Sequence, residues 1–336
     1  MRNRTVILLS ALLTLLIIVV IMTGSFFAIQ NNTNNVTRSE DSAASSSLNT
    51  FESQNFEKDQ FDGSIIYQGQ RYEVNTFIDT VLFLGIDSSD QDRNGIGIKE
   101  GGRSDVIILF IIDNRNKTIT PFEINRDTMV NVDIYDNEGN YLTQGLEQIT
   151  MQYSYGISTS KACRLTKEKV SDLLGRTKID SIISLTMDGI EPIVDSIGGV
   201  TLKLQSDETA LNPSYCKDAI IHLDGTSAKE FVRSRDTEIR GSNIERMSRQ
   251  TQFMLALFQN IKGKGDAIVE TMENAAGGYL YKDIDADSIS HMTQYDYSER
   301  LIVLPGYNNI SNQHDEFYVD EEKLTETILD LFYIKQ

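Results

Sequence analysis

Residues 5–29 form an uncharged and almost wholly apolar segment behind Arg2 and Arg4. At 1.5 Å per residue, a helix of this length exceeds the roughly 30 Å hydrocarbon core of a bilayer. The two arginines favour a cytoplasmic tail, residues 1–4. The alternative is a cleaved signal peptide, whose apolar region is normally shorter, about 7–15 residues. The segment therefore predicts a single-pass anchor in the cell membrane, with the C-terminal part of the chain outside the cell.

Residues 30–62 are rich in Asn, Thr, Ser, Asp and Glu and show no apolar period, which is typical of a flexible tether. No further linker follows, so residues 63–336 are expected to form one extracellular domain. Cys163 and Cys216 both fall in this domain. An exported compartment permits a disulfide between them, but nothing in the sequence gives their separation, so two free thiols are the alternative.

The charge balance limits the possible partners. The chain has 31 Lys and Arg against 49 Asp and Glu, a net charge of −18. Nucleic-acid binding needs clustered basic residues that neutralise phosphates, so a general nucleic-acid binder is excluded. Hydrophobic content of 40% is ordinary for a globular protein.

Strand-like and helical segments alternate along the domain. The early strand-like runs are 80–86, 105–112 and 118–124, and the second is continuously apolar after Asp105, as in a strand covered on both faces. The period turns helical from about residue 142. We expect helices at 161–174, 187–197, 224–232, 243–261 and 321–333, and strands at 182–185 and 200–204. This alternation predicts a layered α/β domain.

Charged residues stand at the ends of the three early strands. Asp87 follows the first, Arg103 and Asp105 precede or begin the second, and Arg126 follows the third. Ligands of layered α/β folds bind at strand ends, although a single Asp there is often only a cap or turn residue. Carboxylates beside arginines suggest a divalent metal together with a polyphosphate-like ligand.

Five arginines fall between residues 233 and 249, an excess that is unusual in an acidic chain. Arg233 and Arg235 are two residues apart at a predicted helix end, where both can turn toward one anion. Arg246 and Gln250, with Arg249, lie on one face of a helix. A solvated helix face with i,i+4 ion pairs is the alternative. The fixed guanidinium fork favours an anion site.

Several segments, in this order and spacing, carry a resemblance to a known family. They are FLGID (83–87), GRSDVIILF (102–110), NRDTMV (125–130), VDSIGGVTLKL (194–204), HLDGTSAKEFVRSR (222–235) and IERMSRQTQFM (244–254). Over residues 80–261 the chain resembles the LytR–CpsA–Psr family of bacterial cell-envelope proteins.

The resemblance implies an α–β–α domain with a central mixed sheet flanked by helices. It also implies a phosphotransferase that moves a glycopolymer, such as a teichoic acid or capsule, from a polyprenyl-pyrophosphate carrier to peptidoglycan. Mg²⁺ (or Mn²⁺) would be held by Asp87 and Asp105. The pyrophosphate would be held by Arg103, Arg126, Arg233, Arg235, Arg246 and Gln250. Arg103, Arg126 and Asp127 would be catalytic, with Asp127 either orienting Arg126 or acting as a base. The lipid would lie in a groove lined by Phe253, Met254 and Leu257.

The chain departs from the family pattern in places. Asn125 replaces the usual proline, residues 149–156 (ITMQYSYG) depart from the usual Ile-Asn-x-Ala-Tyr stretch, and an acidic residue expected near 242–243 is absent. Two other functions therefore stay open. One is a polyprenyl-phosphate-binding or regulatory module without turnover, and the other is a lipid pyrophosphatase.

Overall fold

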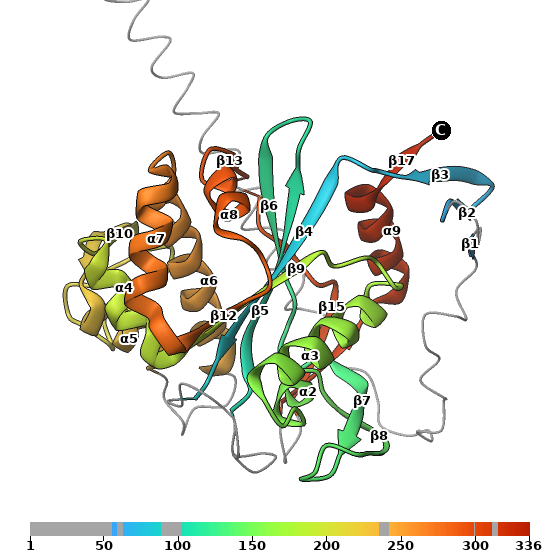
Figure 1. Ribbon diagram of the computed structural model, residues 1–336, viewed down its shortest axis with the longest axis horizontal. Coiled ribbons are helices and arrows are strands. Elements are labelled where there is room, and N and C mark those ends of the chain that lie inside the picture. The colour runs from blue at the N-terminus through green and yellow to red at the C-terminus, as the bar shows by residue number, and fades with distance from the viewer. Residues whose placement is uncertain (1–55, 59–62, 89–101, 235–241, 299, 311–314) are drawn as a thin grey trace, which may run out of the picture. The chain divides into compact units, whose positions relative to one another are not determined.

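The computed structural model describes residues 56–58, 63–88, 102–234, 242–298, 300–310 and 315–336 (Figure 1). The predicted anchor at residues 5–29 lies outside these residues, as do residues 89–101 of the loop after the first strand. In the part of the chain that the structure describes, no helix combines the length and apolarity needed to cross a bilayer.

A seven-stranded mixed sheet forms the centre of the fold. Its strands run in the order β12-β9-β4-β5-β6-β13, with β14 also pairing with β6. β5 is antiparallel to both of its neighbours, whereas β4 and β9 are parallel. The strands are β4 (Ile78–Ile86), β5 (Ser104–Asp113), β6 (Thr118–Glu123), β9 (Ser181–Thr186), β12 (Leu280–Lys282), β13 (Asp296–Tyr297) and β14 (Ile302–Val303).

Both faces of this sheet are covered, because successive side chains of a strand point to opposite sides. On β4, Phe83 packs into one core and Leu82 and Leu84 into the other. Helices α4 (Ile190–Ser196), α5 (Gly225–Arg233), α6 (Ser242–Ile261) and α7 (Gly265–Ala276) supply the first core. Helices α2 (Met151–Ser154), α3 (Thr159–Leu173) and α9 (Glu321–Phe332) supply the second (Figure 1). The α–β–α arrangement expected from the sequence is confirmed.

The remaining elements are short. Two hairpins are β7 (Met129–Tyr135) with β8 (Tyr141–Gln148) and β15 (Gly306–Ile310) with β16 (Asp315–Val319). β10 (Val200–Lys203) pairs with β11 (Ile220–Leu223), and a small sheet joins β1 (Phe56–Lys58), β2 (Ile65–Tyr67), β3 (Gln70–Val74) and β17 (Tyr333–Lys335). The 3₁₀ turns η2 (Met187–Gly189) and η3 (Gly277–Tyr279) and helix α8 (Ala286–Met292) complete the described elements.

The helical period expected from about residue 142 is wrong, since residues 141–148 form strand β8. Leu142 and Leu146 have the i,i+4 spacing of a helix, but they are 60% and 44% exposed and pack into neither core. Helix α3 ends at Leu173, within one residue of the predicted end at 174. Gly175, two residues after the helix, has a φ of +67°, the left-handed conformation with which glycine commonly terminates a helix. Cys163 is buried and Cys216 is exposed, and the described structure has no disulfide between them.

Candidate functional site

The last residue of β4 and the first residues of β5 lie side by side, and this brings two carboxylate residues together at one end of the central strands. The backbone N–H groups of Asp87 and Asp105 both donate to the carbonyl oxygen of Arg103, at 2.9 and 3.0 Å. Gly102 makes this return possible, because its φ is +83° and an added Cβ would lie only 2.7 Å from Ser88 Cβ. Asp87, Arg103 and Asp105 therefore meet where the sequence predicted, with Asp87 and Arg103 exposed and Asp105 buried.

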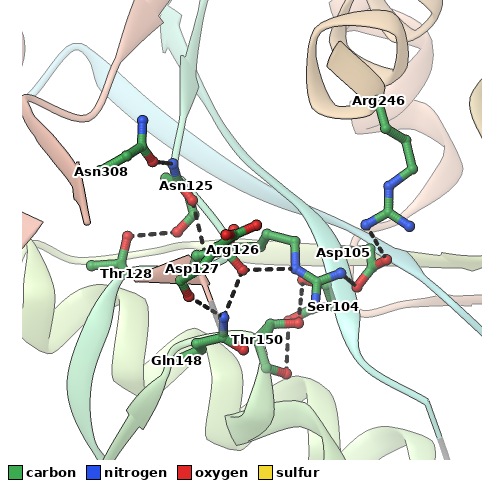
Figure 2. A network of polar contacts seen from close by, with 11 residues as sticks. Ser104, Asp105, Asn125, Arg126, Asp127, Thr128, Gln148, Thr150, Arg246 and Asn308 are labelled. Atoms are coloured by element: carbon green, nitrogen blue, oxygen red, sulfur yellow. Dashed lines mark hydrogen bonds and ion pairs between the residues drawn. The ribbon is translucent and has the colours of Figure 1, made fainter. Parts of the chain in front are cut away.

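Asp105 lies between two buried guanidinium groups, as Figure 2 shows. Its Oδ1 contacts Arg126 Nη1, and its Oδ2 lies 2.9 Å from Arg246 Nη2. The three residues are 2%, 8% and 6% exposed, respectively. Arg126 comes from the turn after β6 and Arg246 from α6, so residues far apart in the sequence converge on one carboxylate. Burial makes each of these charges costly to leave unpaired.

A tight turn holds Arg126 in place. Asn125 Oδ1 accepts from the N–H of Asp127 at 2.9 Å, and its carbonyl oxygen accepts from the N–H of Thr128 at 3.1 Å. An asparagine forms this side-chain-closed turn well, which accounts structurally for its place before Arg126. Asp127 is buried, and its Oδ1 lies 3.3 Å from Arg126 Nε and accepts from Gln148 Nε2 at 2.8 Å. Of the two roles predicted for Asp127, this geometry favours orientation of Arg126.

Thr150 ties the arginine turn to the start of β5, a connection that the sequence did not indicate. Its N–H donates to the Arg126 carbonyl oxygen at 3.2 Å, and its Oγ1 donates to the Ser104 carbonyl oxygen at 3.0 Å (Figure 2). Thr150 is fully buried. The segment 149–156 departs from the family pattern, yet through Thr150 it holds the backbone of Ser104, next to Asp105, and of Arg126, which contacts Asp105.

The other arginines differ from one another in position. Arg249 is buried and braces the end of α5, where its Nε donates to the Phe231 carbonyl oxygen at 3.1 Å and its Nη1 lies 3.0 Å from Glu208 Oε2. It also bonds to the carbonyl oxygen of Ser234, next to Arg233. Arg233 is exposed at the end of α5. The sequence placed Arg249 on the same helix face as Arg246, but in the structure its contacts are with the end of α5 and with Glu208. Arg235 lies outside the described residues.

Gln250 connects the polar site to an apolar cavity. Its Nε2 donates to the Val232 carbonyl oxygen at 3.1 Å, while its buried Oε1 accepts no hydrogen bond from the described residues. The cavity has a volume of about 30 Å³, and its walls include Phe83, Phe253 and Met254. Phe253, Met254 and Leu257 all pack in the same core, and of the three only Phe253 and Met254 border the cavity. The lipid groove expected from the resemblance stays a prediction.

Glu123 is a half-buried acid near this site that was not predicted from the sequence. It ends β6, and its Oε1 accepts from Thr251 Oγ1 of α6 at 2.9 Å. Burial raises the pKa of the Glu123 carboxyl, and the hydrogen bond from Thr251 opposes only part of that rise. A glutamate at the end of an apolar strand carries no sequence signal of burial, since glutamate is mostly exposed.

The comparisons with known proteins place the chain in a family. The model of the LytR_cpsA_psr family matches residues 30–330, so the chain belongs to the LytR–CpsA–Psr family. A polyisoprenyl-teichoic acid–peptidoglycan teichoic acid transferase, TagU of Oceanobacillus iheyensis, is 26% identical over 215 residues, which are 62% of this chain and 60% of TagU. The corresponding transferase TagV of Bacillus subtilis is 28% identical over 188 residues, which are 54% of this chain and 43% of TagV. The chain thus matches about three-fifths or less of the length of these relatives.

Solved structures share the fold. A structure of TagT bound to LIIa-WTA has a TM-score of 0.56 at 22% identity, covering 76% of this chain and 90% of that chain. The crystal structure of B. subtilis TagV has a TM-score of 0.55 at 20% identity, covering 76% and 97%. These similarities confirm the mixed α/β architecture.

Proposed function

We propose that the chain is a membrane-anchored phosphotransferase that moves a glycopolymer from a polyprenyl-pyrophosphate carrier to peptidoglycan. The observation that carries the proposal is the buried Asp105 carboxylate held by Arg126 and Arg246 at one end of the central strands. Membership of the LytR–CpsA–Psr family and the names of the teichoic acid transferases among its relatives support the same reaction. Residues 5–29 would anchor the chain in the cell membrane, with the N-terminus cytoplasmic and the domain extracellular.

The charges of the buried site explain how an anion would enter. Arg126 and Arg246 are balanced by Asp105 and Asp127, so the site holds no excess positive charge by itself. A pyrophosphate that takes the donors held by Asp105 would displace this carboxylate from the two guanidinium groups. Exposed Arg103 and Arg233 would add positive charge at the entrance. Guanidinium forks suit phosphate oxygens because they donate two parallel hydrogen bonds.

A divalent cation would stabilise Asp105 after this exchange. Asp87 and Asp105 share the Arg103 carbonyl oxygen through their N–H groups, so their carboxylates belong to adjacent strand ends. Mg²⁺ or Mn²⁺ takes few carboxylates and completes its shell with phosphate oxygens and water, which fits this donor set. Among the described residues, no group of three or more His, Cys, Asp or Glu side chains could hold a metal. When bound, the cation would neutralise charge on the phosphoryl oxygens.

The arginines would act mainly by stabilising the transition state. A sugar hydroxyl of peptidoglycan attacks the phosphorus atom that carries the glycopolymer, and the polyprenyl phosphate leaves as its P–O bond breaks. Arg126, oriented by Asp127, would stabilise the charge on the equatorial oxygens, together with Arg246. Gln250, whose Oε1 lacks a partner in the described structure, stands between this site and the cavity bounded by Phe253 and Met254. That cavity would widen to take the first isoprene units.

The test is transfer by the full chain in detergent, supplied with a labelled glycan on polyprenyl pyrophosphate, Mg²⁺ and isolated peptidoglycan. We expect label on sedimented peptidoglycan, and a loss of about 100-fold or more in the Arg126→Ala variant, because transition-state charge loses a donor. Arg164→Ala is the matched control, since Arg164 is half-exposed and pairs only with Glu168 in the described structure. Equal transfer by wild type and Arg126→Ala contradicts the proposal.

The same assay separates the two other functions. A binding or regulatory module would retain the lipid but leave peptidoglycan unlabelled after prolonged incubation. A lipid pyrophosphatase would release lipid monophosphate and free glycan phosphate at the same rate with or without peptidoglycan.

A further inference from the structure

A second cleft lies between α9 and the small sheet formed by β1, β2, β3 and β17. Its volume is about 660 Å³, within the range of about 300–1,000 Å³ usual for small-molecule sites. The elements that form it stand apart from α4–α7, at the other side of the central sheet (Figure 1). None of the residues assigned to the arginine site contributes to its walls.

The strand register places a row of polar and aromatic side chains on one face of the small sheet. Tyr67 pairs directly with Gln70, and Tyr72 pairs directly with Lys335. Gln70 and Tyr72 are two residues apart on β3, as are Tyr333 and Lys335 on β17, so these five side chains share a face. All five border the cleft.

Helix α9 forms the opposite wall. Glu326, Leu329 and Asp330 stand at i, i+3 and i+4, so they form one stripe of the helix, and Tyr333 follows directly after the helix as the first residue of β17. Leu329 is buried, whereas Glu326 and Asp330 are exposed. The cleft therefore has an apolar floor and hydrogen-bonding groups along both walls.

The tyrosine hydroxyl groups of this cleft are available to a ligand. Within the described structure, the hydroxyl groups of Tyr67, Tyr72 and Tyr333 form no hydrogen bond, and none of these three rings pairs with another aromatic ring. Each tyrosine is only partly exposed. An unstacked tyrosine offers an apolar ring face together with a hydroxyl that donates and accepts.

The turn between β2 and β3 is strained where it borders the cleft. Gln68 and Gly69 have φ values of +49° and +75°, the left-handed pair that a two-residue hairpin of this kind requires. Asparagine is the usual residue at the first position, because longer side chains adopt this conformation less readily. Gln68 borders the cleft, and its amide side chain is longer than that of the asparagine usual at this turn position. Strain kept at such a position is typical of functional surfaces.

The charges of the walls limit the class of ligand. Glu326 and Asp330 are balanced by Lys335 and by Arg300, which lies 3.8 Å from Asp330, so the cleft has no excess positive charge to attract phosphate and other anions. A sugar chain without charge fits the remaining features, since its hydroxyl groups match tyrosine, amide and carboxylate groups and its C–H faces match the tyrosine rings. We propose that this cleft is a binding site for an uncharged glycan.

The cleft is remote from the arginine site. The N–H of Asn75, next to β3, donates to the Phe332 carbonyl oxygen at 2.8 Å, which places the cleft at the beginning of β4. Asp87 follows the other end of β4, whose nine residues span about 30 Å. A glycan bound here holds the protein on its polymer and leaves the reacting site open. The inference does not depend on turnover at the arginines.

Binding should be measured by calorimetry on the full chain in detergent, with a hexamer of N-acetylglucosamine as the uncharged probe. We expect saturable binding by wild type, and a loss of about tenfold or more in Tyr67→Ala and Tyr72→Ala, equivalent to about 1.4 kcal/mol each. Tyr72→Phe should keep most of the affinity, because the ring face remains. Tyr307→Ala, which removes an exposed tyrosine outside the cleft, is the matched control.

Two further probes make the class of ligand decisive. A phosphodiester-linked polyol and a proline-rich peptide should both fail to bind at concentrations that saturate with the hexamer. Binding of either with equal affinity, or hexamer binding that survives both alanine substitutions, overturns the proposal. If the tyrosine variants fail to fold, Glu326→Ala with Asp330→Ala on the exposed face of α9 is the alternative, and unchanged affinity there overturns it equally.

Discussion

Replacing Asp105 by asparagine tests the charge balance of the buried site. The substitution keeps the shape of the side chain but leaves Arg126 and Arg246, 8% and 6% exposed, without their shared carboxylate. Removing one member of a buried ion pair costs about 3–5 kcal/mol, and we expect the lower end because asparagine keeps one acceptor oxygen. For a domain of this size each kcal/mol lowers the melting temperature by about 2–4 °C, so the expected loss is about 6–12 °C.

Inorganic pyrophosphate should distinguish this explanation from simple loss of packing. In the presence of a chelator, the anion should raise the melting temperature of Asp105→Asn, because it replaces the missing negative charge, and should raise that of wild type much less. At 100 times its dissociation constant such a ligand contributes about 2.7 kcal/mol. In wild type, Mg²⁺ and pyrophosphate together should stabilise more than the sum of either alone, since Asp105 passes from the guanidiniums to the cation.

Thermal unfolding of the full chain in detergent, followed by circular dichroism, gives both measurements. Asp188→Asn is the matched control, because the Asp188–Lys229 pair is about one-quarter exposed and should cost no more than about 1 kcal/mol. The reasoning is refuted if Asp105→Asn melts within about 2 °C of wild type. It is also refuted if pyrophosphate without metal stabilises wild type and variant equally.

Three more substitutions test the surroundings of the site. Burial raises the pKa of the Glu123 carboxyl, so the stability contributed by this group is complete at acidic pH and is lost as the pH rises through the folded-state pKa. Urea unfolding should therefore show Glu123→Gln to be more stable than wild type at pH 8 but not at pH 4. Arg249→Met should lower the free energy of unfolding by about 3 kcal/mol and slow glycan transfer, because it leaves the buried Glu208 without its ion-pair partner and releases the end of α5. An unchanged urea unfolding curve contradicts this expectation. Met254→Trp should fill the apolar cavity and lower the isoprenoid lipid found by mass spectrometry in the purified chain at least tenfold, with overpacking costing about 1–3 kcal/mol.

The central sheet and its helices could be predicted because their apolar residues serve packing alone. Residues 106–112 are continuously apolar, and in the structure β5 is covered on both faces. The convergence of Asp105, Arg126 and Arg246 followed from charges at strand ends and on one helix face. The pairing itself could not be predicted, since it depends on where α6 crosses the sheet.

The errors have equally physical causes. Leu142 and Leu146 show helical spacing, but they lie on an exposed hairpin where no core selects the period. Thr150, Glu123 and Arg249 owe their roles to tertiary contacts with backbone carbonyl oxygens or side chains from other elements. Polar residue types give no sequence signal for such contacts. The cleft at α9 could not be predicted either, because its walls come from two segments far apart in the sequence, 67–72 and 326–335.

The phosphorus content of the product tests the central claim most directly. The full chain would receive a polyprenyl-pyrophosphate glycan labelled both in its sugar and in the phosphorus next to that sugar, and the peptidoglycan would then be washed and counted. Phosphotransfer at the arginine site predicts one labelled phosphorus for each labelled glycan on peptidoglycan, with unlabelled lipid monophosphate released. Glycan on peptidoglycan without labelled phosphorus, or label released only into solution, contradicts the account.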